Sequence, residues 1–148
     1  MIYIASDHGG FELKKLLVEY FRSKNVDIQD LGPHEYVPDD DYPNYTIPLI
    51  KHVLESQGNK GILICRNGVG VSMLANKFKG IRCALSWNIK HAISARNDDD
   101  TNVLALAADY TDPEEAKEIV KAWLATNASV EARHLRRLKK VSESGQEL

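Results

Sequence analysis

Two glycine-containing segments of this 148-residue chain carry polar side chains to the start of a helical pattern. The first is Asp7-His8-Gly9-Gly10. Its carboxylate can accept hydrogen bonds from sugar hydroxyls, and its imidazole can donate to phosphate. Glycines let the backbone approach a ligand, and a helix N-terminus favours an anion. A helix-capping aspartate beside a surface histidine is the alternative interpretation of the same residues.

The second segment follows the most apolar run of the chain and contains Asn67, Gly68, Val69 and Gly70. Their successive backbone N–H groups predict an anion-binding nest at the start of a helix. No Gly-Lys-Ser/Thr follows at P-loop spacing, and Met73 occupies the place of the third glycine of a dinucleotide fingerprint. The segment therefore favours a small anionic ligand over a nucleotide.

Cys65 opens this glycine segment and is its candidate reactive thiol. A helix N-terminus and the adjacent Arg66 both favour a thiolate. The alternative is a small, buried, hydrophobic residue, and this is the interpretation that we favour for Cys83, which lies within a predicted strand.

Three consecutive carboxylates, Asp98, Asp99 and Asp100, precede a further apolar run. Such a group can hold a hard cation such as Mg²⁺, although a solvated turn is the commoner explanation. Mutual repulsion is expected to raise the pKa of some of these carboxyl groups, so that one of them holds a proton.

A basic segment near the end of the chain contains Arg133, His134 and Arg137. The two arginines are four residues apart, so they share one face of a helix and can grip phosphate with forked donors. The alternative is a solvated basic face. A nucleic-acid patch is disfavoured because no aromatic residues are interleaved with these charges.

Short apolar runs that alternate with helical patterns must position these residues. Strands are predicted over 1–6, 26–31, 61–65, 82–85 and 103–106. Helices are predicted over 11–21, 45–55, 71–77, 89–97, 112–124 and 132–141. The alternation predicts one α/β domain spanning 1–148, a three-layer sandwich with a five-stranded, mostly parallel sheet, a C-terminal helix and a frayed tail over 142–148. Ligands of such sheets bind beyond the carboxyl ends of the strands, where we expect the candidate residues.

Composition excludes several classes of protein. With 19 basic and 21 acidic residues the net charge is −2, which argues against a nucleic-acid or membrane partner. No apolar run approaches the ~20 residues of a membrane span. An acid as early as Asp7 argues against a signal peptide. We therefore expect a cytosolic chain, in which thiols are usually reduced. The two cysteines form no CxxC pair, which argues against a zinc ribbon or a disulfide scaffold.

The order of these motifs resembles the type B ribose-5-phosphate isomerase family, which includes the galactose-6-phosphate isomerase subunits. The resemblance extends from Met1 to about Val141. Its blocks are Ile4-Ala5-Ser6-Asp7-His8-Gly9-Gly10, Asp41-Tyr42-Pro43, Ile62-Leu63-Ile64-Cys65 with Asn67-Gly68-Val69-Gly70, Ala75-Asn76-Lys77, Gly80-Ile81-Arg82, Asp100-Thr101-Asn102-Val103-Leu104 and Arg133-His134. It implies a Rossmann-like fold, a sugar-phosphate substrate, no metal or organic cofactor, and a homodimer or dimer of dimers whose active sites are shared between subunits.

The resemblance also implies a reaction, in which a proton moves between C2 and C1 of the sugar through an enediolate. It assigns Cys65 as the base, and Val71 stands where members without the cysteine carry a glutamate. The N–H groups of the 67–70 loop would stabilise the enediolate, an effect that is usually large. The implied substrate ligands are Asp7 and Tyr42 for the sugar and His8, Arg133 and Arg137 for the phosphate, with His134 placed among them without an assigned role.

Three positions depart from the pattern of the family. Arg66-Asn67 stand in place of Gly-Thr, Asp98-Asp99 in place of His-Asn, and Asp109 in place of an arginine that contacts phosphate. We predict that Asp98 shuttles the ring-opening proton normally handled by the histidine, and that Asp99 contacts substrate. Arg66 either replaces the charge missing at Asp109 or pairs with the new carboxylates across a dimer interface.

The departures keep other functions open beside ribose 5-phosphate isomerisation. A tetrose 4-phosphate cannot close a furanose ring and would need no ring-opening histidine. A hexose 6-phosphate is a second alternative substrate. A sugar-phosphate-binding protein or partner subunit without catalysis is the alternative from another class.

Overall fold

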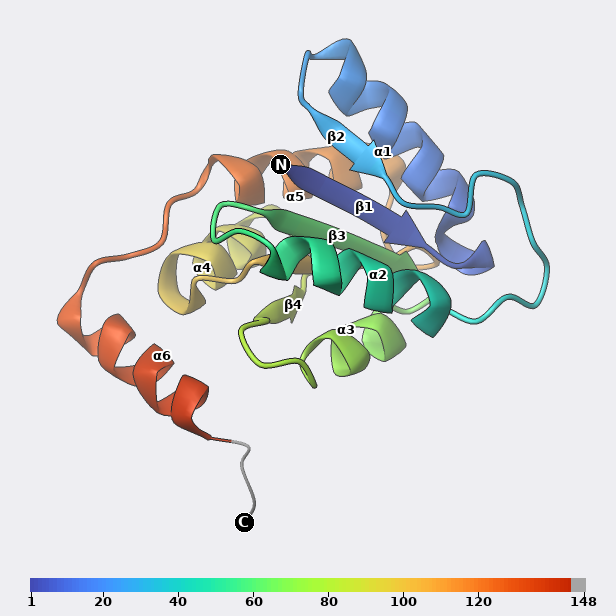
Figure 1. Cartoon of the computed structure of the whole chain (residues 1–148). Helices are drawn as coiled ribbons and strands as arrows, with labels where there is room; N and C mark the ends of the chain where they lie inside the picture. Colours follow the sequence, from blue (N-terminus) through green and yellow to red (C-terminus); the bar gives the residue numbers. More distant parts are fainter. Residues whose placement is uncertain (145–148) are drawn as a thin grey trace.

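The computed structural model describes residues 1–144, and its centre is a sheet of five parallel strands (Figure 1). The strands lie in the order β2-β1-β3-β5-β4. Their bounds are β1 (Ile2–Ser6), β2 (Ile28–Asp30), β3 (Lys60–Cys65), β4 (Cys83–Leu85) and β5 (Val103–Ala107). The predicted α/β class and five strands are confirmed, and the sheet is parallel throughout.

The central strand β3 explains the continuous apolar run in the sequence. Ile62 pairs with Ile4 of β1 on one side and with Leu104 of β5 on the other. Side chains along β3 are buried alternately in two cores, one on each face of the sheet. A strand covered on both faces has no solvent side, so polar residues are absent from its interior positions.

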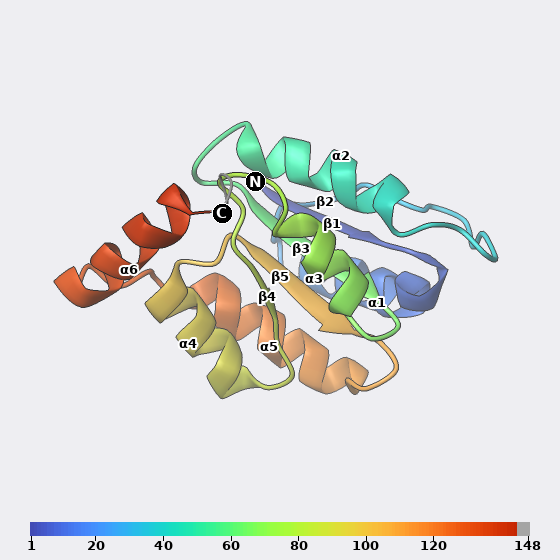
Figure 2. The same ribbon diagram turned by 90° about the horizontal axis from the view of Figure 1, so that it is seen from below.

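Helices cover both faces of the sheet (Figure 2). On one face lie α1 (Phe11–Ser23), α4 (Ile89–Asp99) and α5 (Pro113–Ala125), and on the other lie α2 (Pro43–Leu54) and α3 (Val69–Ala75). The first core includes the fully buried Trp123, whose indole N–H donates to Thr101 Oγ1 at 2.9 Å. The predicted three-layer sandwich is therefore confirmed. No helix within residues 1–144 has the length and apolarity needed to cross a membrane.

The last helix, α6 (Ala132–Glu143), projects away from the sheet, on the side opposite to the arrowhead of β1 (Figure 1). His134 is its only buried residue. Ser142 and Glu143, the first residues of the tail predicted to fray, complete the helix. The hydroxyls of Ser142 and Ser144 donate to carbonyls of the preceding turn and hold it closed. The rest of the predicted tail, 145–148, lies outside the described residues.

Candidate active site

Two segments meet where β1 and β3 end. A short 3-10 turn, η1 (His8–Gly10), packs directly on β3, because a Cβ at Gly10 would lie 2.7 Å from the carbonyl oxygen of Ile64. A Cβ at Gly9 would lie still closer to Cγ of Arg66. We call the predicted residues that gather here the carboxyl-edge cluster: Asp7, His8, Tyr42, Cys65, Arg66, Asn67, Gly68, Val69 and Gly70.

Cys65 lies at the bottom of this cluster and is only 5% exposed. The backbone N–H of Gly68 donates to its Sγ at 3.1 Å, and Asn67 Oδ1 lies 3.8 Å from the same sulfur. Gly68 has a φ of 72°, which favours glycine, and this turn brings its N–H back onto the sulfur. The sulfur thus has a backbone donor on one side and an amide oxygen on the other.

In the loop that follows Cys65, two of the N–H groups of the predicted anion nest already have acceptors within the same segment. Val69 N–H donates to the Asn67 side chain at 3.0 Å, and Gly68 N–H is directed at sulfur. Two of the N–H groups in the predicted nest therefore have partners within the loop in this conformation, and the nest stays a prediction. A ligand that uses Val69 N–H must first displace the Asn67 amide.

Asp7 and Tyr42 flank the loop. Asp7 is buried, and its Oδ1 accepts a hydrogen bond from Gly10 N–H at 3.1 Å, so the predicted cap is present. Burial raises the pKa of Asp7. The Tyr42 ring lies on Gly70, where a Cβ would come within 2.8 Å of Cε1. Gly70 thus lets the phenol lie directly over the glycine loop.

Two basic groups occupy the rim of the cluster. His8 Nδ1 lies 2.8 Å from Asp40 Oδ1, and this hydrogen bond raises the pKa of His8. Arg66 Nη1 lies 3.5 Å from Asp109 Oδ2, so two departures from the family pattern form a pair within one chain. Asp40 was missed in the sequence, where it reads as part of an acidic loop. Its position one residue before the Asp41-Tyr42-Pro43 block is the signal that could have drawn attention to it.

The other predicted residues lie elsewhere and form a distal cluster: Asp98, Asp99, Arg133, His134 and Arg137. Asp98 and Asp99 end α4 and thus precede β5, at the amino edge of the sheet. The expectation that candidate residues follow strands is wrong for this cluster, because helices that lead into strands end at the opposite edge. Its members are exposed except for His134.

His134 links the two helices of the distal cluster. Its side chain is 5% exposed, and its Nδ1 lies 3.8 Å from Asp98 Oδ1. That nitrogen has no hydrogen-bond partner within residues 1–144. Arg133 and Arg137 are exposed one turn apart on α6, and Arg133 Nε lies 2.7 Å from Glu131. The cluster therefore combines two carboxylates, a buried imidazole and two guanidinium groups.

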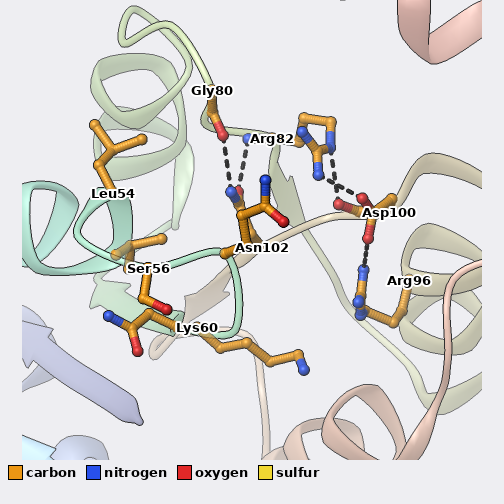
Figure 3. A pocket seen from close by; sticks show the side chains of 11 residues that line it. Leu54, Ser56, Lys60, Gly80, Arg82, Arg96, Asp100 and Asn102 are labelled. Atoms are coloured by element: carbon orange, nitrogen blue, oxygen red, sulfur yellow. Dashed lines mark hydrogen bonds and ion pairs between the residues drawn. The ribbon is translucent and has the colours of Figure 1, made fainter.

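Asp100 lies between two arginine side chains (Figure 3). Its carboxylate lies 2.6 Å from Arg82 Nη2 and also pairs with Arg96, beside a cavity of about 520 Å³ that Lys60 lines. Two guanidinium groups balance its charge, so it adds little to the predicted repulsion at Asp98. Within residues 1–144 no group of histidine, cysteine and carboxylate side chains has the arrangement of a metal site.

Comparisons with known proteins show the family to which the chain belongs. A family profile described as Ribose/Galactose Isomerase matches residues 2–141. The chain is 45% identical to a Mycoplasma pneumoniae protein named "Probable ribose-5-phosphate isomerase B", over 95% of this chain and 91% of that protein. The Mycoplasma genitalium ribose-5-phosphate isomerase B, solved with bound ribulose-5-phosphate, is 40% identical with a TM-score of 0.91 over 96% and 93% of the chains. The Thermotoga maritima ribose 5-phosphate isomerase is 36% identical with a TM-score of 0.92, over 97% of both chains.

Proposed function

This chain belongs to the ribose/galactose isomerase family, and from that premise we propose that it interconverts ribose 5-phosphate and ribulose 5-phosphate. The observation that carries the proposal is Cys65, a buried sulfur that accepts the Gly68 N–H at 3.1 Å. Asp7 and Tyr42 stand beside it, at the edge of the sheet where ligands of parallel sheets bind. The relative from Mycoplasma genitalium was solved with the ketose phosphate bound.

In this mechanism the Cys65 thiolate removes the proton from C2 of the open-chain aldose. The electron pair of that C–H bond forms the C1–C2 double bond, and the carbonyl oxygen takes up negative charge. Cys65 then returns the proton to C1, and the hydroxyl proton on O2 passes to O1, so that O2 becomes the ketone oxygen and O1 a hydroxyl. N–H groups of the glycine loop stabilise the enediolate, and Asp7, whose pKa is raised by burial, supplies or removes a hydroxyl proton.

A complete site requires a second copy of the chain in this proposal. The carboxyl-edge and distal clusters lie at opposite edges of one sheet, so one chain cannot bring them together. Side chains on α6 provide apolar surface for an interface, since Leu135 is 51% exposed and Val141 is 61% exposed. We assign a homodimer in which the distal cluster of each copy completes the carboxyl-edge cluster of the other. A dimer of dimers preserves the same pairing.

The distal cluster then supplies the groups that the first cluster lacks. Arg133 and Arg137 grip the phosphate opposite His8, and Arg66 adds a cation in place of the arginine absent at Asp109. Asp98 opens the sugar ring, with the buried His134 beside it to share the proton, and Asp99 contacts the sugar. We place the reaction in the cytosol, where free thiols such as Cys65 and Cys83 stay reduced.

A tetrose 4-phosphate is the second candidate substrate, and the specific observation in its favour is Asp98-Asp99 in place of His-Asn. A substrate that cannot cyclise to a furanose needs no ring-opening residue. A hexose 6-phosphate isomerase and a sugar-phosphate-binding protein without catalysis are the remaining alternatives.

Turnover of ribose 5-phosphate by the purified full-length chain tests the proposal, with erythrose 4-phosphate and galactose 6-phosphate assayed in parallel. We expect turnover of ribose 5-phosphate at about 1 s⁻¹ or faster, in the range typical of enzymes. Preference for the tetrose or the hexose phosphate would replace the pentose assignment. Binding of all three without turnover by a folded dimer would favour the non-catalytic alternative.

A further inference from the structure

The loop between β2 and α2 delivers one shielded carboxylate, that of Asp40, to His8. Asp40 Oδ1 accepts the backbone N–H of His8 at 2.8 Å and lies 2.8 Å from the ring Nδ1 of the same residue. The Asp40 side chain is 5% exposed, and that of His8 is 22% exposed. One oxygen thus holds both the main chain and the ring of His8.

We propose that Asp40 is a positioning residue that orients the His8 ring and stabilises it as an imidazolium, so that Nε2–H is presented to the phosphate of the substrate. This inference rests on the proposed function, which takes His8 as a phosphate ligand. It adds a residue outside the matched blocks and gives it a chemical task.

The hydrogen-bond pattern decides which ring nitrogen faces the ligand. An ionised carboxylate only accepts hydrogen bonds, so Nδ1 must carry a proton. Nε2 lies across the ring and is directed away from Asp40. In a neutral ring of this tautomer Nε2 is an acceptor, which a phosphate oxygen repels. Only the protonated ring donates from Nε2, and that hydrogen bond is charge-assisted.

Burial makes the positive ring the better partner for Asp40. Among residues 1–144 no lysine or arginine pairs with this carboxylate, and His8 is its basic neighbour. A shielded charge without a partner is costly. Although burial acts in the other direction, the hydrogen bonds from His8 hold the pKa of Asp40 below its ordinary value. The hydrogen bond to Asp40 in turn raises the pKa of His8.

Other ionisable groups near this pair act in known directions. The carboxylate of Asp7 also raises the pKa of His8, whereas the Arg66 guanidinium lowers it. Tyr45, on α2, has its pKa raised by burial and by Asp40, so it faces the carboxylate as a neutral phenol. Asp40 is thus the first cause of the His8 shift, and its removal is expected to lower the pKa of His8.

The loop that carries Asp40 is anchored independently of His8. Lys14 is buried at 2% exposure, and its Nζ lies 2.6 and 2.7 Å from the two carboxylate oxygens of Asp30. The same ammonium donates to the carbonyl of Pro33 at 2.9 Å. The start of the loop is therefore fixed by a buried ion pair, and Asp40 is expected to keep its place in variants that alter His8.

A titration of the histidine ring signals by NMR tests the inference without any assay of turnover. Asp40→Asn keeps an oxygen acceptor and the side-chain shape but removes the charge. His8 is assigned by the signal lost in His8→Gln. We expect the midpoint of the His8 titration to fall in Asp40→Asn and to stay at the wild-type pH in Asp39→Asn, an exposed neighbour with the same charge change. An unchanged midpoint in Asp40→Asn would overturn the proposal.

Binding of inorganic phosphate and the KM for ribose 5-phosphate give the functional readout. Above the wild-type midpoint of His8 we expect Asp40→Asn to weaken both about threefold to tenfold, the size of one charge-assisted hydrogen bond. At a pH low enough to charge His8 in both proteins, the two should converge. Changes in kcat should stay within about twofold. A KM that does not depend on pH in this way, or a loss confined to kcat, would contradict the assignment. A chain that binds phosphate with this pH dependence but does not isomerise would refute the proposed function and leave the role of Asp40 intact.

Discussion

The carboxyl-edge and distal clusters are built in opposite ways. Cys65 and Asp7 are 5% and 7% exposed and follow directly from central strands, so the sheet determines where they lie. Arg133 and Arg137 are exposed on a helix that barely touches the sheet. The first cluster is preorganised by one chain, whereas the second gains its function in our proposal only when another copy is present. A single fold can thus keep half of a site rigid and leave the other half to association.

The two clusters also differ in the chemical roles that we propose for their residues. In our proposal the carboxyl-edge cluster contains the base, the loop N–H groups and the sugar ligands, with the phosphate ligands His8 and Arg66 on its rim. In the same proposal the two arginines of the distal cluster bind the phosphate, and its Asp98–His134 pair opens the ring. Variants of Cys65 should therefore change kcat, variants of the phosphate ligands in either cluster should change binding, and variants of Asp98 should change ring opening.

The largest effect is expected from Cys65→Ala. Removal of a positioned base costs about 10²–10⁴-fold in kcat, while KM changes little because the side chain makes few binding contacts. The matched control is Cys83→Ala. Burial raises the pKa of Cys83 to about 12, so no thiolate forms there at assay pH, and turnover should persist. Equal losses in both variants would remove Cys65 from the mechanism.

Mixing two inactive variants tests most directly whether each active site is shared between two copies of the chain. Arg137→Ala should lose about tenfold to a hundredfold in kcat/KM with the phosphate clamp weakened. When Cys65→Ala and Arg137→Ala dimers are unfolded and refolded together, half of the dimers should be mixed, each with one intact site. Activity should then recover to about a quarter of wild type. If mass spectrometry shows mixed dimers and activity still does not recover, the two clusters do not form a site that is shared between two copies.

Asp98→Asn should lower turnover of ribose 5-phosphate about tenfold to a hundredfold. This loss lies at or below the lower end of general acid–base effects, because sugar rings also open spontaneously. The side chain keeps its size, so the loss would report the proton. The deficit should shrink when ring opening limits the rate of neither the wild type nor the variant. Single turnovers that start from the open-chain ketose meet this condition. Unchanged turnover of the aldose in Asp98→Asn would show that another group opens the ring.

The smallest effect is expected at the rim of the first cluster. Arg66→Ala should raise the KM about threefold to tenfold and leave kcat unchanged, since it removes one cation from the phosphate site. Asp109→Asn should not weaken binding, because an exposed pair 3.5 Å apart contributes at most about 1 kcal/mol and competes with the phosphate for Arg66. A loss of affinity in Asp109→Asn would indicate that the pair itself shapes the site.

Much of the fold was predictable from local patterns. The run 61–65 is apolar without interruption because β3 is buried on both faces, and Asp112 followed by Pro113 predicts the start of α5. The position of Cys65 at a strand end before the glycine loop was predictable for the same reason, since a strand end followed at once by a helix is a local feature. The role of Asp40 and the pairing of Asp100 with two arginines were not, because their partners lie 18 to 32 residues away in the chain, except for Arg96.

By itself, the sequence determined the element types, the apolar strands and the residues that can do chemistry, because these depend on composition and spacing over a few residues. Only the tertiary structure decided which edge of the sheet each residue occupies. A parallel sheet sends every strand in one direction, so residues after strands meet at one edge and residues at the ends of the connecting helices meet at the other. That geometry separates Asp98 from Cys65, although both lie in the part of the chain that resembles one family.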